Sequence, residues 1–174
     1  MNLGSLGGLK PVGTSYGERG ISIGGTLPFE WRHKFAKSAT VDLGIPVPFD
    51  PASYLVGPWF CANLWTPGHG FSSLSSFCVE HKLPFNYTWW FEGQLNVNCH
   101  RDGSSRHYKL NKQGEVVADP IKLNDLTDQL DRVVVRFNAC RQDSNRAKIK
   151  RIKEELAGLL TVPPLPAFVL GEAI

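Results

Sequence analysis

The sequence predicts a mixed α+β fold in which an antiparallel β meander, at about residues 85–119, packs with C-terminal helices. Within this region, apolar and polar side chains alternate at residues 95–100, as they do in a half-buried strand. Beyond residue 120, apolar side chains instead recur every three or four residues, which is the spacing of a helix buried on one face. The first 25 residues carry eight of the seventeen glycines, and this composition favours an extended arm.

Length and composition are those of one globular domain. The 174 residues are 42% hydrophobic and 20% charged, which excludes an intrinsically disordered chain. We expect a flexible, extended arm at residues 1–25, a single α+β domain at 26–160 and an apolar, proline-rich tail at 161–174. No apolar run approaches the roughly 20 residues of a membrane span, and no classical signal for secretion is evident. The sequence therefore favours an intracellular, cytoplasmic protein or one within a particle.

The N-terminal half is expected to hold short elements. Residues 26–49 carry three prolines and indicate edge strands and extended segments. Asp50, followed by a proline, is typical of a helix start with the aspartate as N-cap. Ser72 or Ser73 is expected to cap another short helix that ends near His81.

The meander follows as four predicted strands. They are expected at residues 86–91, 95–100, 106–110 and 115–118. Asp102-Gly103 is the strongest of the turns between them, because this pair adopts the positive φ that a tight hairpin needs. The strands would pair in chain order, each antiparallel to the next.

Two helices complete the predicted fold. One apolar face consists of Leu123, Leu126, Leu130, Val133, Val134 and Phe137. Asn124 or Asp125 is expected to cap this helix. The second face consists of Ile149, Ile152, Leu156, Leu159 and Leu160. Prolines then prevent the helix from continuing into the tail, whose apolar side chains need a surface on this domain or on a partner.

The net charge of +3 arises from one local patch at residues 141–153, which contains a single acid, Asp143. Its cations are Arg141, Arg146, Lys148, Lys150, Arg151 and Lys153. On a helix, Arg146, Lys150 and Lys153 lie along one flank. Cations early in a helix oppose its dipole at about 0.3–1 kcal/mol each, and phosphate contacts would offset that cost. The six residues are therefore candidate nucleic-acid-binding residues, with a solvated helix face as the alternative.

Aromatic residues of the meander add to this hypothesis. An exposed sheet face would present rings for base stacking from Tyr87, Trp89, Phe91, His107 and Tyr108. The alternative is that these rings belong to the core, where aromatic side chains on strands are more common. No aromatic pattern of the common RNA-binding sheet motifs is present.

Cysteine and histidine residues give two further hypotheses. Cys61 is a candidate nucleophile, with His100 or His107 as its base. The candidate zinc ligands are Cys61, His69, Cys78, His81 and Cys99. The alternative for these residues is a set of buried free thiols, because no two cysteines form a close pair of the zinc-knuckle type. No cofactor is expected.

The arm and the tail provide the leading functional hypothesis, because neither is expected to fold by itself. We expect a non-enzymatic structural or interaction protein within an oligomer or a larger assembly, such as a virion- or ribonucleoprotein-type particle. The arm and tail would then bind protein partners or self-associate. One alternative is a nucleic-acid-binding accessory protein that uses the basic helix at 141–153. The other is a Cys/His hydrolase or a zinc-binding protein.

Overall fold

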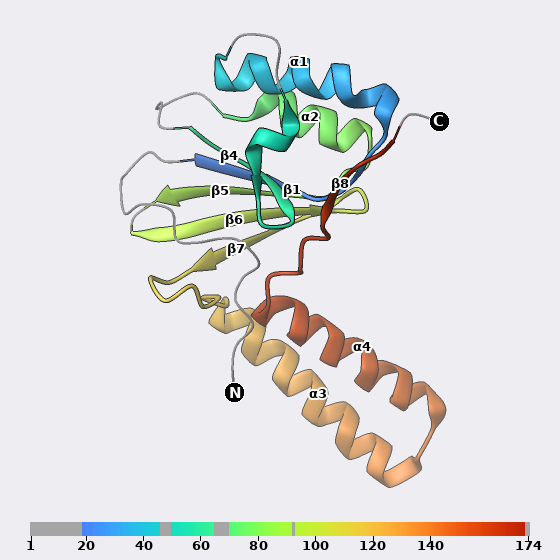
Figure 1. Cartoon of the computed structure of the whole chain (residues 1–174). Coiled ribbons are helices and arrows are strands. Elements are labelled where there is room, and N and C mark those ends of the chain that lie inside the picture. The colour runs from blue at the N-terminus through green and yellow to red at the C-terminus, as the bar shows by residue number, and fades with distance from the viewer. Residues whose placement is uncertain (1–18, 46–49, 65–69, 92, 173–174) are drawn as a thin grey trace. The chain divides into compact units, whose positions relative to one another are not determined.

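The computed structural model describes residues 19–45, 50–64, 70–91 and 93–172. The chain divides into two compact units, which Figure 1 shows as a sheet with its helices and a pair of long helices. We call Met1–Gly114 together with Pro164–Ile174 the sheet unit, and Glu115–Pro163 the hairpin unit. The hairpin unit is thus inserted into the sequence of the sheet unit. The predicted α+β class is confirmed.

The sheet unit is built on a six-stranded antiparallel sheet with the order β3-β4-β1-β5-β6-β7. The strands are β1 (Arg19–Ile23), β3 (Leu55–Val56), β4 (Trp59–Leu64), β5 (Phe85–Phe91), β6 (Gln94–Arg101) and β7 (Ser104–Leu110). Strands β5, β6 and β7 form the predicted meander, and Asp102 and Gly103 take positive φ in its second turn. The predicted fourth strand at 115–118 is wrong, because only Val116 forms an isolated bridge there before α3 begins at Pro120.

The remaining elements of the sheet unit are short. They are η1 (Phe29–Trp31), α1 (Arg32–Leu43), η2 (Pro51–Tyr54), α2 (Ser72–Glu80) and the parallel strand pair β2 (Gly25–Leu27) and β8 (Phe168–Leu170). The prediction of extended structure at 26–49 is wrong for α1, which buries only Phe35 and Ala39 and so has a weak apolar pattern. The Asp50 cap is confirmed, since its carboxylate accepts from Ala52 N at 3.0 Å.

The core lies where α1 and α2 cover one face of the sheet (Figure 1). Phe35 of α1 is fully buried there, and its ring centroid lies 5.1 Å from that of Phe60 and 5.5 Å from that of Phe77. Asp42 of α1 caps α2, because its carboxylate accepts from Ser73 N at 3.1 Å and from Leu74 N at 2.7 Å. The cap expected from a local serine therefore comes from the neighbouring helix.

The expectation of a flexible arm at residues 1–25 needs correction where the structure describes it. Residues 1–18 lie outside the described part, but β1 is an interior strand between β4 and β5. Gly24 allows the main chain at Pro166 to approach closely, since a Cβ at residue 24 would overlap the main-chain oxygen of Pro166. Part of the glycine-rich composition therefore serves packing.

The tail packs on the sheet unit of its own chain. Leu165 and Phe168 are buried, and β8 pairs with β2. The indole of Trp59 donates to the oxygen of Leu165 at 2.9 Å, and Arg32 donates to the oxygen of Gly171 at 2.6 Å. The described part of the tail thus has a surface within the same chain.

The hairpin unit consists of α3 (Pro120–Cys140) and α4 (Asp143–Leu160), which lie side by side (Figure 1). Asp119 caps α3 by accepting from Ile121 N at 3.0 Å, so the helix begins earlier than a cap at Asn124 or Asp125 would allow. Arg141, with φ 44°, ends α3 in the left-handed conformation. Among the helices that the structure describes, none combines the length and apolar character needed to cross a membrane.

Candidate nucleic-acid interface

A groove of about 490 Å³ runs between α3 and α4 within the hairpin unit. Its lining residues are Gln129, Arg132, Val133, Arg136, Lys148, Arg151, Ile152 and Glu155. Val133 and Ile152 come from the apolar stripes by which the two helices face each other. Four of the other lining residues are Lys or Arg, two from each helix, and one is an acid. The groove therefore carries a surplus of positive charge.

Ion pairing neutralises little of this charge. Arg151 Nε lies 3.2 Å from Glu155 Oε1, and both side chains are exposed, at 80% and 47%. Exposed pairs of this kind contribute about 0.3–0.5 kcal/mol on a helix, because water screens both charges. Arg132 donates through Nε to the main-chain oxygen of Asp128 at 3.1 Å, which orients its side chain without neutralising it.

Charge is also divided along the length of the hairpin. Residues 132–151, at the end that includes the turn, contain seven Lys or Arg and one acid, Asp143. The remainder of the hairpin unit, 115–131 and 152–163, contains seven acids and two lysines. The unit as a whole is close to neutral, so the positive potential is confined to one half of the hairpin.

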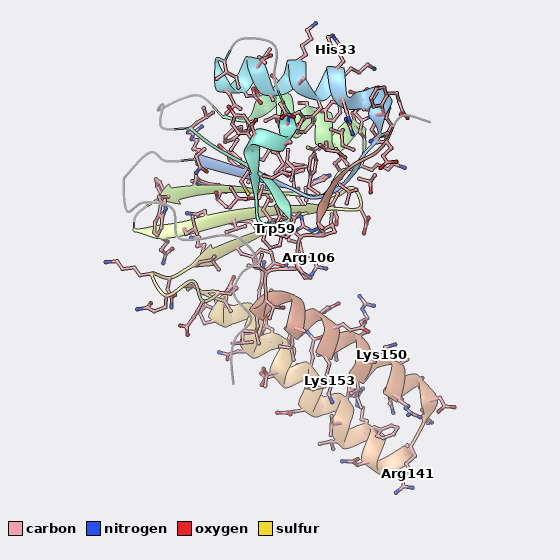
Figure 2. All side chains as sticks on the ribbon, in the orientation of Figure 1. His33, Trp59, Arg106, Arg141, Lys150 and Lys153 are labelled. Atoms are coloured by element: carbon pink, nitrogen blue, oxygen red, sulfur yellow. The ribbon has the colours of Figure 1, made fainter. Side chains whose placement is uncertain are left out.

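The structure separates the six predicted nucleic-acid-binding residues into three groups. Lys148 and Arg151 line the groove. Arg146, Lys150 and Lys153 lie on the other side of the apolar stripe of α4, as the rotation of 100° per residue requires. Arg141 lies at the turn between the helices (Figure 2).

Sequence reasoning missed Arg132 and Arg136 of α3, which complete the groove. A signal was available, because arginines four residues apart lie on one flank of a helix. Their importance depends on α4 lying alongside, and that pairing is not visible in the sequence of α3 alone.

The candidate nucleophile is not brought together with either candidate base. Cys61 on β4 is aligned across the sheet with Ser22 of β1, and that residue is aligned with Asn86 of β5. His100 and His107 lie on β6 and β7, at least three strands away, and their side chains point to the opposite face of the sheet. His100 has a structural role instead, since its ring stacks on Phe85 at 5.0 Å.

The candidate zinc ligands are also dispersed. Cys78 lies in α2, in the core, whereas Cys99 lies on β6 on the sheet face away from that helix. His81 packs between Trp31 and Phe77, with ring centroids 4.1 and 4.3 Å away. Among the described residues, no group of three His, Cys, Asp or Glu side chains is arranged to hold a metal ion, and His69 lies outside them.

Burial opposes ionisation of the thiols in the sheet unit. It raises the pKa of Cys61, although a contact with the Ser22 hydroxyl partly lowers it. Burial likewise raises the pKa of Cys99 to about 11 and that of Cys78 well above its ordinary range. A nucleophilic cysteine needs the opposite shift. All four cysteines are free, and Cys140 is exposed.

Comparisons with protein-family models, with curated proteins and with solved structures found no match to this chain.

Proposed function

We propose that this protein is a nucleic-acid-binding accessory protein whose hairpin groove contacts phosphates. The observation that carries the proposal is the convergence of Arg132 and Arg136 of α3 with Lys148 and Arg151 of α4 on one groove. Two helices from one hairpin thus supply cations to a common surface. Phosphate contacts of Lys and Arg release counterions, and this release drives binding that does not depend on sequence.

The chemistry of the groove favours a polyanion over a small molecule. Small-molecule pockets are mostly apolar and aromatic, with few polar groups. Here the apolar residues are Val133 and Ile152, and the other lining side chains are charged or amide-bearing.

Two triple variants of the full chain test this proposal. One neutralises the groove through Arg136→Gln, Lys148→Gln and Arg151→Gln. The matched control removes the same charge from the other flank of α4 through Arg146→Gln, Lys150→Gln and Lys153→Gln. Affinity for fluorescein-labelled single-stranded and duplex oligonucleotides is measured by anisotropy over a range of salt concentrations.

We expect the groove variant to bind both oligonucleotides about tenfold more weakly or worse, with a salt slope smaller by about two to three. The control should lose less than about threefold, since its cations contribute only long-range attraction. Equal losses in both variants, or an unchanged groove variant, would contradict the proposal.

A second candidate is the interaction protein within a larger assembly. Its support from the tail is weaker, because the described tail packs on its own chain. The observation that favours it is α3, which has no fully buried residue and exposes Ile121 by 72% and Val135 by 68%. Size-exclusion chromatography with light scattering and absorbance at 260 and 280 nm separates the candidates. An oligomer free of nucleic acid would support the assembly protein, whereas a monomer bound to nucleic acid would rule out this second candidate.

A further inference from the structure

A second candidate surface lies on the sheet unit, on the helix-covered face of β5, β6 and β7. Its centre, which we call the aromatic face, consists of Tyr87 and Trp89 of β5, Asn96 and Asn98 of β6, and His107 of β7. The strand register aligns these residues in two rows. One row is Tyr87, Asn98 and His107. The other contains Arg19, Trp89, Asn96 and Lys109 in that order, and it continues beyond Arg19 to Leu64 of β4.

The rings of the aromatic face hold one another in place. The imidazole of His107 reaches across β6 and stacks on Trp89, with centroids 5.4 Å apart and planes inclined by 11°. Tyr87 contacts Trp89 from the same strand at 5.5 Å. A hydrogen bond of 3.1 Å joins His107 Nε2 to the buried amide oxygen of Asn96. The side chains are therefore ordered before any ligand arrives, which lowers the entropy lost on binding.

Exposure along β5 distinguishes this face from the core. Phe85, at the start of the strand, is 6% exposed and belongs to the core cluster. Tyr87, which packs against the edge of that cluster, and Trp89 are half-buried, and Phe91 at the end is 57% exposed. His107 and Lys109 on β7 are exposed as well. The predicted contribution of Tyr108 is wrong, since this side chain points to the other face of the sheet and is buried.

The charge of the sheet is suited to an anionic ligand. Its six strands contain four Lys or Arg residues and no Asp or Glu. Two of these cations, Arg19 and Lys109, lie on either side of Trp89 and Asn96 in one row, roughly 14 Å apart for three strand spacings. An apolar partner would make no favourable electrostatic contact with either cation. A ligand with flat rings and a negatively charged backbone matches the whole surface.

We propose that the aromatic face binds single-stranded nucleic acid, with bases stacking on Trp89 and His107 and phosphates contacting Arg19 and Lys109. This inference rests on the proposed function and specifies its substrate class. Bases of a single strand are free to stack on protein rings, whereas bases of a duplex are already stacked on one another. The aromatic face therefore supplies selectivity for single strands, while the hairpin groove attracts either form.

The test uses the full chain with Trp89→Leu and a matched control, Trp90→Leu. The control makes the same change one residue further along β5, where the side chain points to the opposite face of the sheet. His107→Ala, at an exposed position, serves as a second variant. Thermal unfolding is compared for all variants. The probes are a fluorescein-labelled 12-nucleotide single strand and the duplex of the same sequence, each as DNA and as RNA.

We expect Trp89→Leu to weaken single-strand binding about 5- to 150-fold, the range for losing one stacked base. His107→Ala should weaken it by at least about fivefold. Duplex binding should change less than twofold in both variants, and Trp90→Leu should match the wild type. Unchanged single-strand binding in Trp89→Leu and His107→Ala would overturn this inference. If the groove variant still loses affinity in that case, the proposed function stands without it.

Discussion

The two units of this protein differ in what their side chains contribute. The sheet unit has a core cluster of fourteen buried hydrophobic residues, whereas the two helices of the hairpin unit, which the structure describes in full, bury only Ile152. The hairpin instead concentrates exposed charge. Burial is the main source of folding stability, so substitutions in the core cluster of the sheet unit should change stability. Substitutions in the hairpin should change binding more than folding.

The sequence also provides a separate probe for each unit. All five tryptophans lie between residues 31 and 90, in the sheet unit, and none lies in the hairpin unit. Intrinsic fluorescence therefore follows the sheet unit. The far-ultraviolet circular dichroism signal at 222 nm is dominated by α3 and α4, the two longest helices.

The largest expected effect is that of Phe35→Ala. Phe35 is fully buried and contacts three other rings, so its removal should lower the free energy of unfolding of the sheet unit by about 3–5 kcal/mol. Phe137→Ala, on the half-buried stripe of α3, should cost only about 1–2 kcal/mol, because less apolar area is lost. Urea unfolding followed by fluorescence and by circular dichroism measures both. Equal losses in the two units would contradict the view that burial stabilises the sheet unit more than the hairpin unit.

Alkaline pH should destabilise the sheet unit next most strongly. Above about pH 9 an unfolded thiol ionises, whereas Cys78 and Cys99 stay protonated in the folded unit because burial raises the pKa of each, that of Cys99 to about 11. The folded state then binds more protons, so stability falls as pH rises. Each thiol contributes about 1.4 kcal/mol per pH unit, from about pH 9 to about pH 11 for Cys99.

Urea titrations at pH 8, 9 and 10, followed by fluorescence, measure this slope. Cys99→Ala should reduce the slope of stability against pH by the contribution of one thiol. Cys140→Ala, in the hairpin unit, is the matched control. A slope that Cys99→Ala leaves unchanged would show that other groups cause the alkaline loss.

Asp42→Ala should have a smaller effect, of about 1–2 kcal/mol. Its carboxylate satisfies two main-chain N–H groups at the start of α2, which has no cap from its own residues. Asp42→Asn keeps one of the two acceptor oxygens and should recover part of the loss. Urea unfolding by fluorescence is the measurement, and the argument fails if alanine and asparagine are equally destabilising.

The meander and the two C-terminal helices could be predicted from sequence because their signals are local. Alternation at 95–100 and the Asp102-Gly103 turn lie within one hairpin, and the apolar stripe of α3 lies within one helix. Strand β1 was missed, since its five residues sit in a glycine-rich context. Its role depends on pairing with β4 and β5, which are distant in sequence.

The candidate sites follow the same division. Lys148 and Arg151 could be predicted because the charge run in α4 is local. The groove could not, because Arg132 and Arg136 become part of it only when α3 and α4 lie side by side. The aromatic face could be predicted in part, because the alternation of side chains along a strand assigns each ring to one face of the sheet. The rest could not, because tertiary packing decides which end of that face α1 and α2 leave exposed.

The smallest expected effects come from two neighbouring acids in α4, and they test most directly whether the groove itself contacts nucleic acid. Glu155 lines the groove and pairs with Arg151, whereas Glu154 pairs with Lys150 at 3.9 Å and lies outside the groove. Both pairs are exposed, so Glu155→Gln and Glu154→Gln should each change stability by less than about 0.5 kcal/mol. Removing the carboxylate from the groove should nevertheless strengthen oligonucleotide binding about threefold, the effect of one phosphate contact.

Glu154→Gln removes the same charge one residue away and should leave affinity within the error of the anisotropy measurement. A gain confined to Glu155→Gln would show that position in the groove, not the net charge of the hairpin, sets affinity. Equal gains in both variants would mean that the hairpin acts only through its overall charge, and the groove would then lose its assigned role.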